Sequence, residues 1–168
     1  NRLNLFTTTG LTAEEVHQIG LDNVERIHDA MRDIMKQVKF EGTLQEFFVF
    51  MREDEQFYLP STDEGRQQYL DMAKTAIDDM REAIPEYFGI LPEAPMIVKR
   101  VEAFREQSAG KEFYQSPAQD GSRPGIYYAN LYDMKAMPTY QLEALAYHEG
   151  IPGHHMQRAI AQELEGVP

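Results

Sequence analysis

Apolar residues in the first half of the chain recur every three or four positions, which is the spacing of one face of an α-helix. The run Thr12-Ala13-Glu14-Glu15 predicts a helix start, because a threonine hydroxyl and a glutamate three residues later satisfy free N–H groups there. Gly20 and a second box at residues 22–25 predict a break into a short and a long helix. The stripe comprises Val16, Gly20, Val24, Ile27, Met31, Ile34 and Val38.

Two more capping boxes predict two further helices. Residues 43–46 precede an aromatic segment that includes Phe47, Phe48 and Phe50, which we expect to be core. Residues 61–64 precede an apolar stripe that Pro85 and Gly89 close. Residues 12–89 are therefore predicted to be helical.

The pattern then changes to β-prone segments. Residues 96–101 are rich in β-branched side chains and residues 125–132 in aromatic ones, so both predict strands. A connection rich in Gly, Pro, Ser and Asp separates them, and a last helix is expected over 139–165. The fold class is therefore mainly α with a small β-sheet (α+β). Residues 1–168 are expected to be a single domain or a fragment of a larger one, with its strands in 96–134.

The last helix carries three imidazoles and a carboxylate within residues 148–155, a cluster typical of a metal site. In the zinc-peptidase signature H-E-x-x-H, two histidines four residues apart share one helix face, and the glutamate polarises the metal-bound water. His148 and His154 are six residues apart, which on a regular helix places them roughly 120° apart. A distortion is therefore required.

Pro152 and Gly153 can supply that distortion, because proline lacks the N–H and glycine tolerates unusual backbone angles. Looping out two residues would put His154 where the second histidine of the shorter motif stands. His155 is the fallback if one more residue is looped out. We expect the helix to continue through Pro152 with an interrupted hydrogen-bond ladder.

The run YHEGIPGHHMQ (residues 147–157) resembles the signature of bacterial domain-of-unknown-function family 885. Three other stretches are similar to that family: residues 11–21, 88–92 and 123–130. The resemblance implies a zincin-like, gluzincin-type metallopeptidase with a lengthened motif. It also implies a downstream segment resembling E-G-W-A-L-Y, whose glutamate is the third metal ligand. The chain contains no tryptophan, and that segment is missing from it.

The resemblance assigns roles to particular residues. It implies that His148 and His154 bind zinc and that Glu149 acts as the general base. In zincins an edge strand beside the metal holds an extended peptide by main-chain pairing. Arg123, Tyr127, Tyr128 and Asn130, in and around the second predicted strand, are therefore candidate substrate contacts, although ordinary strand aromatics and a loop arginine explain them equally well.

Composition limits the classes of molecule that the chain is expected to bind. A formal net charge of -12 and scattered basic residues argue against nucleic-acid binding. No apolar run reaches the length of a membrane span, and the first residues do not form a signal peptide. A start at Asn suggests an excised piece and leaves room for a removed export signal, so the compartment stays open, with a periplasmic or exported location favoured over a cytoplasmic one. The absence of cysteine leaves His, Glu and Asp as metal ligands.

Two functions remain open from the sequence. The first is a zinc-dependent peptidase, whose substrate is a peptide and whose third ligand lies in the missing carboxyl-terminal segment. The second is a non-catalytic helical module, or an inactive fragment with a weak or absent metal site. In either case we expect this chain to bind zinc more weakly than the longer protein, because Glu163 and Glu165 lie too far along the motif helix to complete the site.

Overall fold

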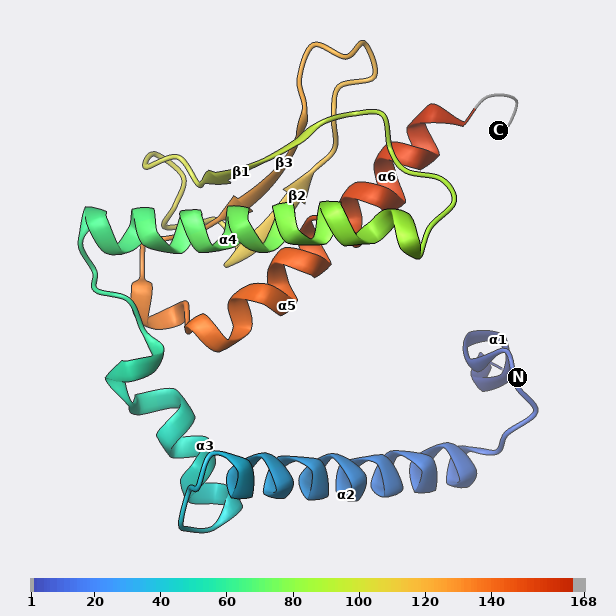
Figure 1. Ribbon diagram of the computed structural model, residues 1–168. Coiled ribbons are helices and arrows are strands. Elements are labelled where there is room, and N and C mark those ends of the chain that lie inside the picture. Colours follow the sequence, from blue (N-terminus) through green and yellow to red (C-terminus); the bar gives the residue numbers. More distant parts are fainter. Residues whose placement is uncertain (1, 165–168) are drawn as a thin grey trace. The chain divides into compact units, whose positions relative to one another are not determined.

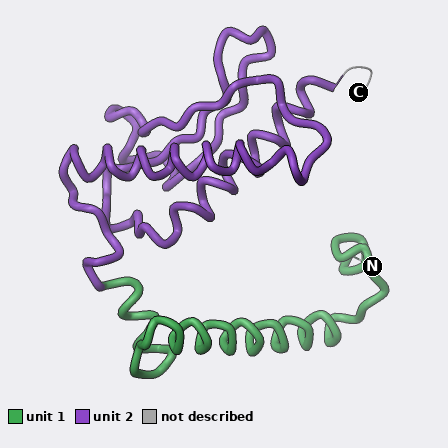
Figure 2. The backbone as a smooth tube through the Cα atoms, viewed as in Figure 1, with its two compact units in different colours: residues 1–53 green, residues 54–168 purple. Residues whose placement is uncertain are grey.

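A computed structural model describes residues 2–164 and divides the chain into two compact units, Asn1–Glu53 and Asp54–Pro168 (Figure 2). Each unit is described by itself. In the part of the chain that the structure describes, no helix has both the length and the apolar character needed to cross a membrane.

The first unit consists of helices α1 (Arg2–Thr7), α2 (Ala13–Gln37) and α3 (Leu44–Glu53). The capping box predicted at Thr12 is confirmed, with Glu15 N–H donating to the Thr12 hydroxyl and Thr12 N–H donating to the Glu15 carboxylate. The box predicted at Thr43 and Glu46 is confirmed in the same way. Its helix packs Phe47 and Phe50 against Phe40.

The break predicted at Gly20 is wrong, because α2 is continuous from residue 13 to residue 37. A capping box stabilises N–H groups that have no helical partner, whereas those of residues 22–25 lie inside a helix that already satisfies them. A single glycine costs a helix only about 1 kcal/mol. The capping signals at residue 12 and the length of the stripe outweigh that cost.

The second unit holds a three-stranded sheet with helices on one face (Figure 1). Its order is η1 (Glu55–Phe57), α4 (Asp63–Ala83), η2 (Ile84–Glu86), β1 (Met96–Arg100), β2 (Glu112–Gln115), β3 (Gly125–Ala129), η3 (Met134–Ala136), α5 (Thr139–Glu149) and α6 (His154–Glu163). The strand order is β1-β3-β2, with β1 parallel and β2 antiparallel to β3. The expected mainly helical α+β class is confirmed.

The two faces of the sheet bury different sets of residues. Tyr69 and Ile77 of α4 and Leu142 of α5 pack with Tyr127 of β3 in the main core. On the opposite face a smaller cluster contains Val101, Ile126 and Tyr128. Because side chains alternate along a strand, Tyr127 and Tyr128 belong to different faces.

The sequence missed strand β2, which falls in the segment expected to be a connection. β2 has only four residues, and its burial is partial at Glu112 and Phe113. Its place in the sheet comes from pairing with β3, in which Tyr114 lies opposite Tyr127. Because β3 is paired on both sides, the free edge of the sheet near α5 belongs to β2.

Candidate metal centre

The helix predicted over 139–165 is two helices in the structure. α5 ends at Glu149 and α6 begins at His154, so Gly150 to Gly153 lie outside both; residue 165 is outside the described residues. The ladder is interrupted as expected, since Gly153 N–H donates to Tyr147 O (2.9 Å) and His155 N–H to Gly150 O (3.0 Å). The interruption is more complete than a bulge, because the chain leaves one helix before it starts the next.

Gly153 lets the turn close against the end of α5. A Cβ atom on Gly153 would collide with the His148 carbonyl group and the Tyr147 carbonyl oxygen. Only glycine fits where the backbone of the turn approaches the preceding helix so closely. Gly153 was predicted to be part of the distortion, and the structure adds a steric reason, because the turn leaves no room for a side chain there.

Contacts with the loop at residues 93–94 and with β2 hold α6 in place. His155 is buried, and its Nδ1 lies 2.8 Å from the Tyr114 hydroxyl and its Nε2 3.0 Å from Ala94 O. The Glu163 carboxylate accepts hydrogen bonds from the N–H groups of Glu93 and Ala94. These contacts fix both ends of α6, and therefore the position of His154 in its first turn.

His155 and Glu163 are consequently occupied by structural roles. Both ring nitrogens of His155 have partners, and burial lowers the pKa of that imidazole, which favours its neutral form. The fallback assignment of His155 as a ligand is not supported by this arrangement. Glu163 faces the loop at residues 93–94 and has no place in the histidine cluster.

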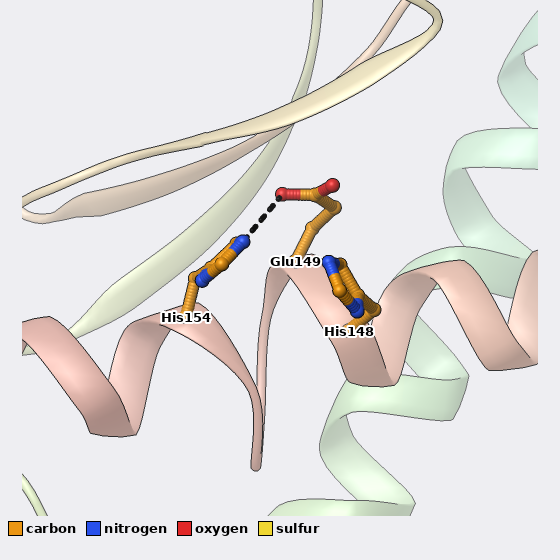
Figure 3. A group of neighbouring side chains, drawn as sticks. All are labelled: His148, Glu149 and His154. Atoms are coloured by element: carbon orange, nitrogen blue, oxygen red, sulfur yellow. Dashed lines mark ion pairs between the residues drawn. The ribbon is translucent and has the colours of Figure 1, made fainter. Parts of the chain in front are cut away.

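His148, Glu149 and His154 come together across the turn (Figure 3). Each offers one ligand atom, and these atoms lie within 4.8 Å of one another. The two imidazole rings have centroids 4.9 Å apart and meet edge to face, and His154 Nε2 lies 3.9 Å from Glu149 Oε2. His148 is exposed, whereas the side chains of Glu149 and His154 are 13% and 31% exposed.

This donor set fits a divalent metal such as zinc. Two imidazoles and a carboxylate are the ligand types that zinc takes when no thiolate is present, and zinc-bound imidazole nitrogens lie about 2 Å from the ion. The three groups already converge, so a small adjustment of the rings could bring both nitrogens to one ion. Among the described residues no fourth His, Asp or Glu joins the group.

A buried polar cluster lies behind Glu149. Tyr69 of α4 donates a hydrogen bond to Glu112 Oε1 of β2 (2.9 Å). Glu112 Oε2 and the Tyr127 hydroxyl are buried and interact with one another, but within the described part of the chain neither has a hydrogen bond of good geometry. Burial raises the pKa of Glu112 to about 7, and the negative charge of Glu149 acts in the same direction. Burial and the Glu112 charge raise the pKa of Tyr127 as well.

The substrate contacts predicted around the second strand need a correction. The strand, β3, is central and has no free edge for a peptide. The Tyr128 hydroxyl donates to Glu102 (3.2 Å), and its ring lies on the sheet face away from α5. Arg123 donates to Ser116 O (2.8 Å) and Asn130 to Glu106 O (2.7 Å). Arg123, Tyr128 and Asn130 therefore hold neighbouring loops, while Tyr127 is on the face of the metal cluster.

Sequence reasoning missed Glu112, Tyr69 and Gln157. Glu112 and Tyr69 are 43 residues apart, so no local pattern links them. The two adjacent aromatic residues Phe113 and Tyr114, which favour strands, were the available signal for β2. Gln157, whose Oε1 lies 2.9 Å from His154 Nδ1, follows the second histidine at a helical i,i+3 spacing.

Comparison with known proteins agrees with the signature run. The family model described as "Bacterial protein of unknown function (DUF885)" matches residues 1–168. The chain belongs to this family. No match to a curated protein was found.

Among solved structures, this DUF885 chain is similar to the crystal structure of "the putative lipoprotein from Colwellia psychrerythraea". The sequences are 35% identical, and the TM-score is 0.84 over 96% of this chain. The chain spans 28% of the length of that neighbour.

Proposed function

We propose that the chain carries the metal-binding half of a zinc-dependent peptidase. The observation that carries this proposal is the convergence of His148, Glu149 and His154 across the Gly150–Gly153 turn. It supports the zincin-like, gluzincin-type interpretation, in which the motif is an H-E-x-x-H lengthened by two residues. The third protein ligand would come from a segment outside this chain.

In this proposal the two histidines and the glutamate have different roles. His148 and His154 would hold the metal, and a bound zinc ion would supply the Lewis acidity that activates water. Glu149, whose Oε2 lies 3.9 Å from His154 Nε2, would accept a proton as general base and return it to the leaving amine. Its low exposure limits competing solvent contacts.

The free edge of β2 supports a peptide as substrate. Asn130 N–H donates to Lys111 O (2.9 Å), and this pair continues the register in which Phe113 faces Tyr128. Hydrogen-bonded pairs alternate along an antiparallel ladder, so the main-chain groups of Glu112 and Tyr114 point away from β3. An extended peptide could add to this edge, beside α5.

A groove beside α6 favours peptides with apolar side chains. Its described lining is entirely uncharged and includes Phe88, Ile90, Gly153, Gln157, Ile160 and Leu164. Gly153 and Gln157 flank His154, so the groove reaches the neighbourhood of the metal cluster. A large apolar side chain could bind there while the backbone follows the β2 edge.

Export is part of the same proposal. The neighbour from Colwellia psychrerythraea is named a lipoprotein and is 35% identical to this chain. Together with the family membership, this name supports a periplasmic or exported location for the protein.

The decisive experiment uses the longer protein that contains this chain. Glu149→Gln should leave zinc stoichiometry unchanged and lower kcat for a peptide library by about 10²–10⁴-fold, because the amide keeps the shape but cannot accept the proton. His148→Ala should lose both zinc and activity. Full activity in Glu149→Gln would refute its role as base. A longer protein without zinc or hydrolysis would favour the non-catalytic module.

A further inference from the structure

Gln157 lies on the outer side of His154, away from the Glu149 carboxylate. His154 Nδ1 is 2.9 Å from Gln157 Oε1, and the opposite ring nitrogen, Nε2, is 3.9 Å from Glu149 Oε2. The two ring nitrogens therefore face different partners. Nε2 is the nitrogen that points into the cluster, and Nδ1 is the one that Gln157 contacts.

The contact is built into α6. His154 and Gln157 are three residues apart in the first turn of the helix, so their side chains lie on one face. The helix is held at that end by buried His155 and at the other by Glu163. The position of Gln157 beside His154 is therefore set by a helix that is held at both ends. The ring of His148, by contrast, has no hydrogen bond among the described residues.

We propose that Gln157 is a positioning residue that sets the tautomer of His154 and so prepares Nε2 to bind a metal. A neutral imidazole carries one N–H, and a metal ligand must offer a lone pair. When the amide oxygen of Gln157 accepts from Nδ1–H, the lone pair is left on Nε2. This inference rests on the proposed metal centre, but the tautomer exists without a metal.

The opposite tautomer would have the opposite effect. If the Gln157 amide N–H₂ donated to Nδ1, the proton would sit on Nε2 and block the metal-facing nitrogen. A metal-binding histidine usually donates its other ring N–H to a neighbouring residue. Mutating that neighbour typically weakens metal binding by about 10–100-fold. Gln157→Met removes the acceptor at similar volume, and Gln157→Glu keeps an oxygen that only accepts.

The first test needs no metal. In the 168-residue chain at about pH 8.5, where histidine is neutral, ring ¹⁵N NMR should show His154 as the Nδ1–H form in the native sequence and in Gln157→Glu. Gln157→Met should shift it toward the Nε2–H form. Gln162→Met changes an exposed glutamine of the same helix and should leave His154 unchanged. An Nε2–H form of His154 in the native chain would overturn the proposal.

The second test measures zinc alone. Titration calorimetry on the same chain should show binding weakened about 10–100-fold in Gln157→Met, and not weakened in Gln157→Glu or Gln162→Met. Equal affinity in the native chain and Gln157→Met would refute the positioning role. Equal affinity in the native chain and His148→Ala would instead refute the metal centre, and the tautomer measurement would still decide the role of Gln157.

Discussion

Single side chains around His148, Glu149 and His154 fall into two groups, those that face one another across the α5–α6 turn and those that hold the surrounding elements in place. Glu149 and His154 face one another, and Gln157 contacts the far side of His154. His155 differs from His154 by one position, yet it is buried and bonded to Tyr114 and Ala94. Residue type alone does not distinguish these roles, because the direction of each side chain depends on where α6 begins.

Glu112 provides a residue-level prediction about pH. Burial raises its pKa to about 7, above the ordinary value of 4.5, against the hydrogen bond from Tyr69. The folded protein then binds more protons than the unfolded chain between those values. Its stability should fall as pH rises through this window, by about 3 kcal/mol at most. Well above pH 7 Glu112 is ionised in both states, so its contribution to the free energy of unfolding should no longer change with pH.

Glu112→Gln tests this linkage. The glutamine can still accept from Tyr69 but cannot ionise, so urea unfolding between about pH 4.5 and 8 should show a flatter stability profile than the native chain. Carboxyl groups that do not interact with Glu112 titrate equally in both proteins and cancel in the difference. Parallel profiles for the two proteins would show that Glu112 does not titrate in this range.

At the scale of elements, the site depends on where α5 stops and α6 starts. Gly150 N–H still completes α5 by donating to Ala146 O (2.8 Å), and Gly153 folds back on the same helix end. The capping boxes at Thr12 and Thr43 show that helix starts are encoded locally. The α5–α6 turn is encoded locally as well, but it also depends on tertiary packing, because Ile77 and Met96 lie so close to Gly150 that no side chain fits there.

Gly153→Ala should damage this turn. Its Cβ would meet backbone atoms that cannot move independently, so we expect a loss of stability of about 1–3 kcal/mol and weaker zinc binding as His154 is displaced. Gly89→Ala is the matched control, because a Cβ there meets nothing within 4 Å. Thermal unfolding and zinc titration of the two variants give the comparison, and a Gly153→Ala protein indistinguishable from Gly89→Ala would exclude a steric role for Gly153.

At the scale of the whole molecule, buried residues are concentrated in the second unit. Both clusters of packed core residues lie within residues 59–160. In the first unit the described buried residues are Met35 and Phe47. The apolar stripe of α2 includes Val24 at 50%, Ile27 at 42% and Ile34 at 48% exposure. The two units therefore differ in how much apolar surface each removes from water.

Residues 54–168 should fold when they are produced without the first unit. This segment contains the sheet, α4 to α6 and both core clusters, so it should unfold in a single cooperative transition and keep its near-ultraviolet circular dichroism. Residues 1–53 alone should show only partial helicity, because an isolated helix is marginal without packing. A broad, non-cooperative transition of 54–168 would contradict this expectation.

The sequence by itself determined the starts of α2 and α3, the α+β class, the residue types of the candidate metal site and the place of the distortion between His148 and His154. These features depend on neighbours within a few residues, where spacing and capping chemistry are sufficient. Only the tertiary structure decided that β3 is central and that Tyr127 and Tyr128 belong to different faces of the sheet, with Tyr127 on the face of α4 and α5. It also brought Tyr69 to Glu112 across 43 residues. Such pairings are fixed by competition among all the packing surfaces of the chain, because strand order and buried contacts are properties of the assembled core and not of any one segment.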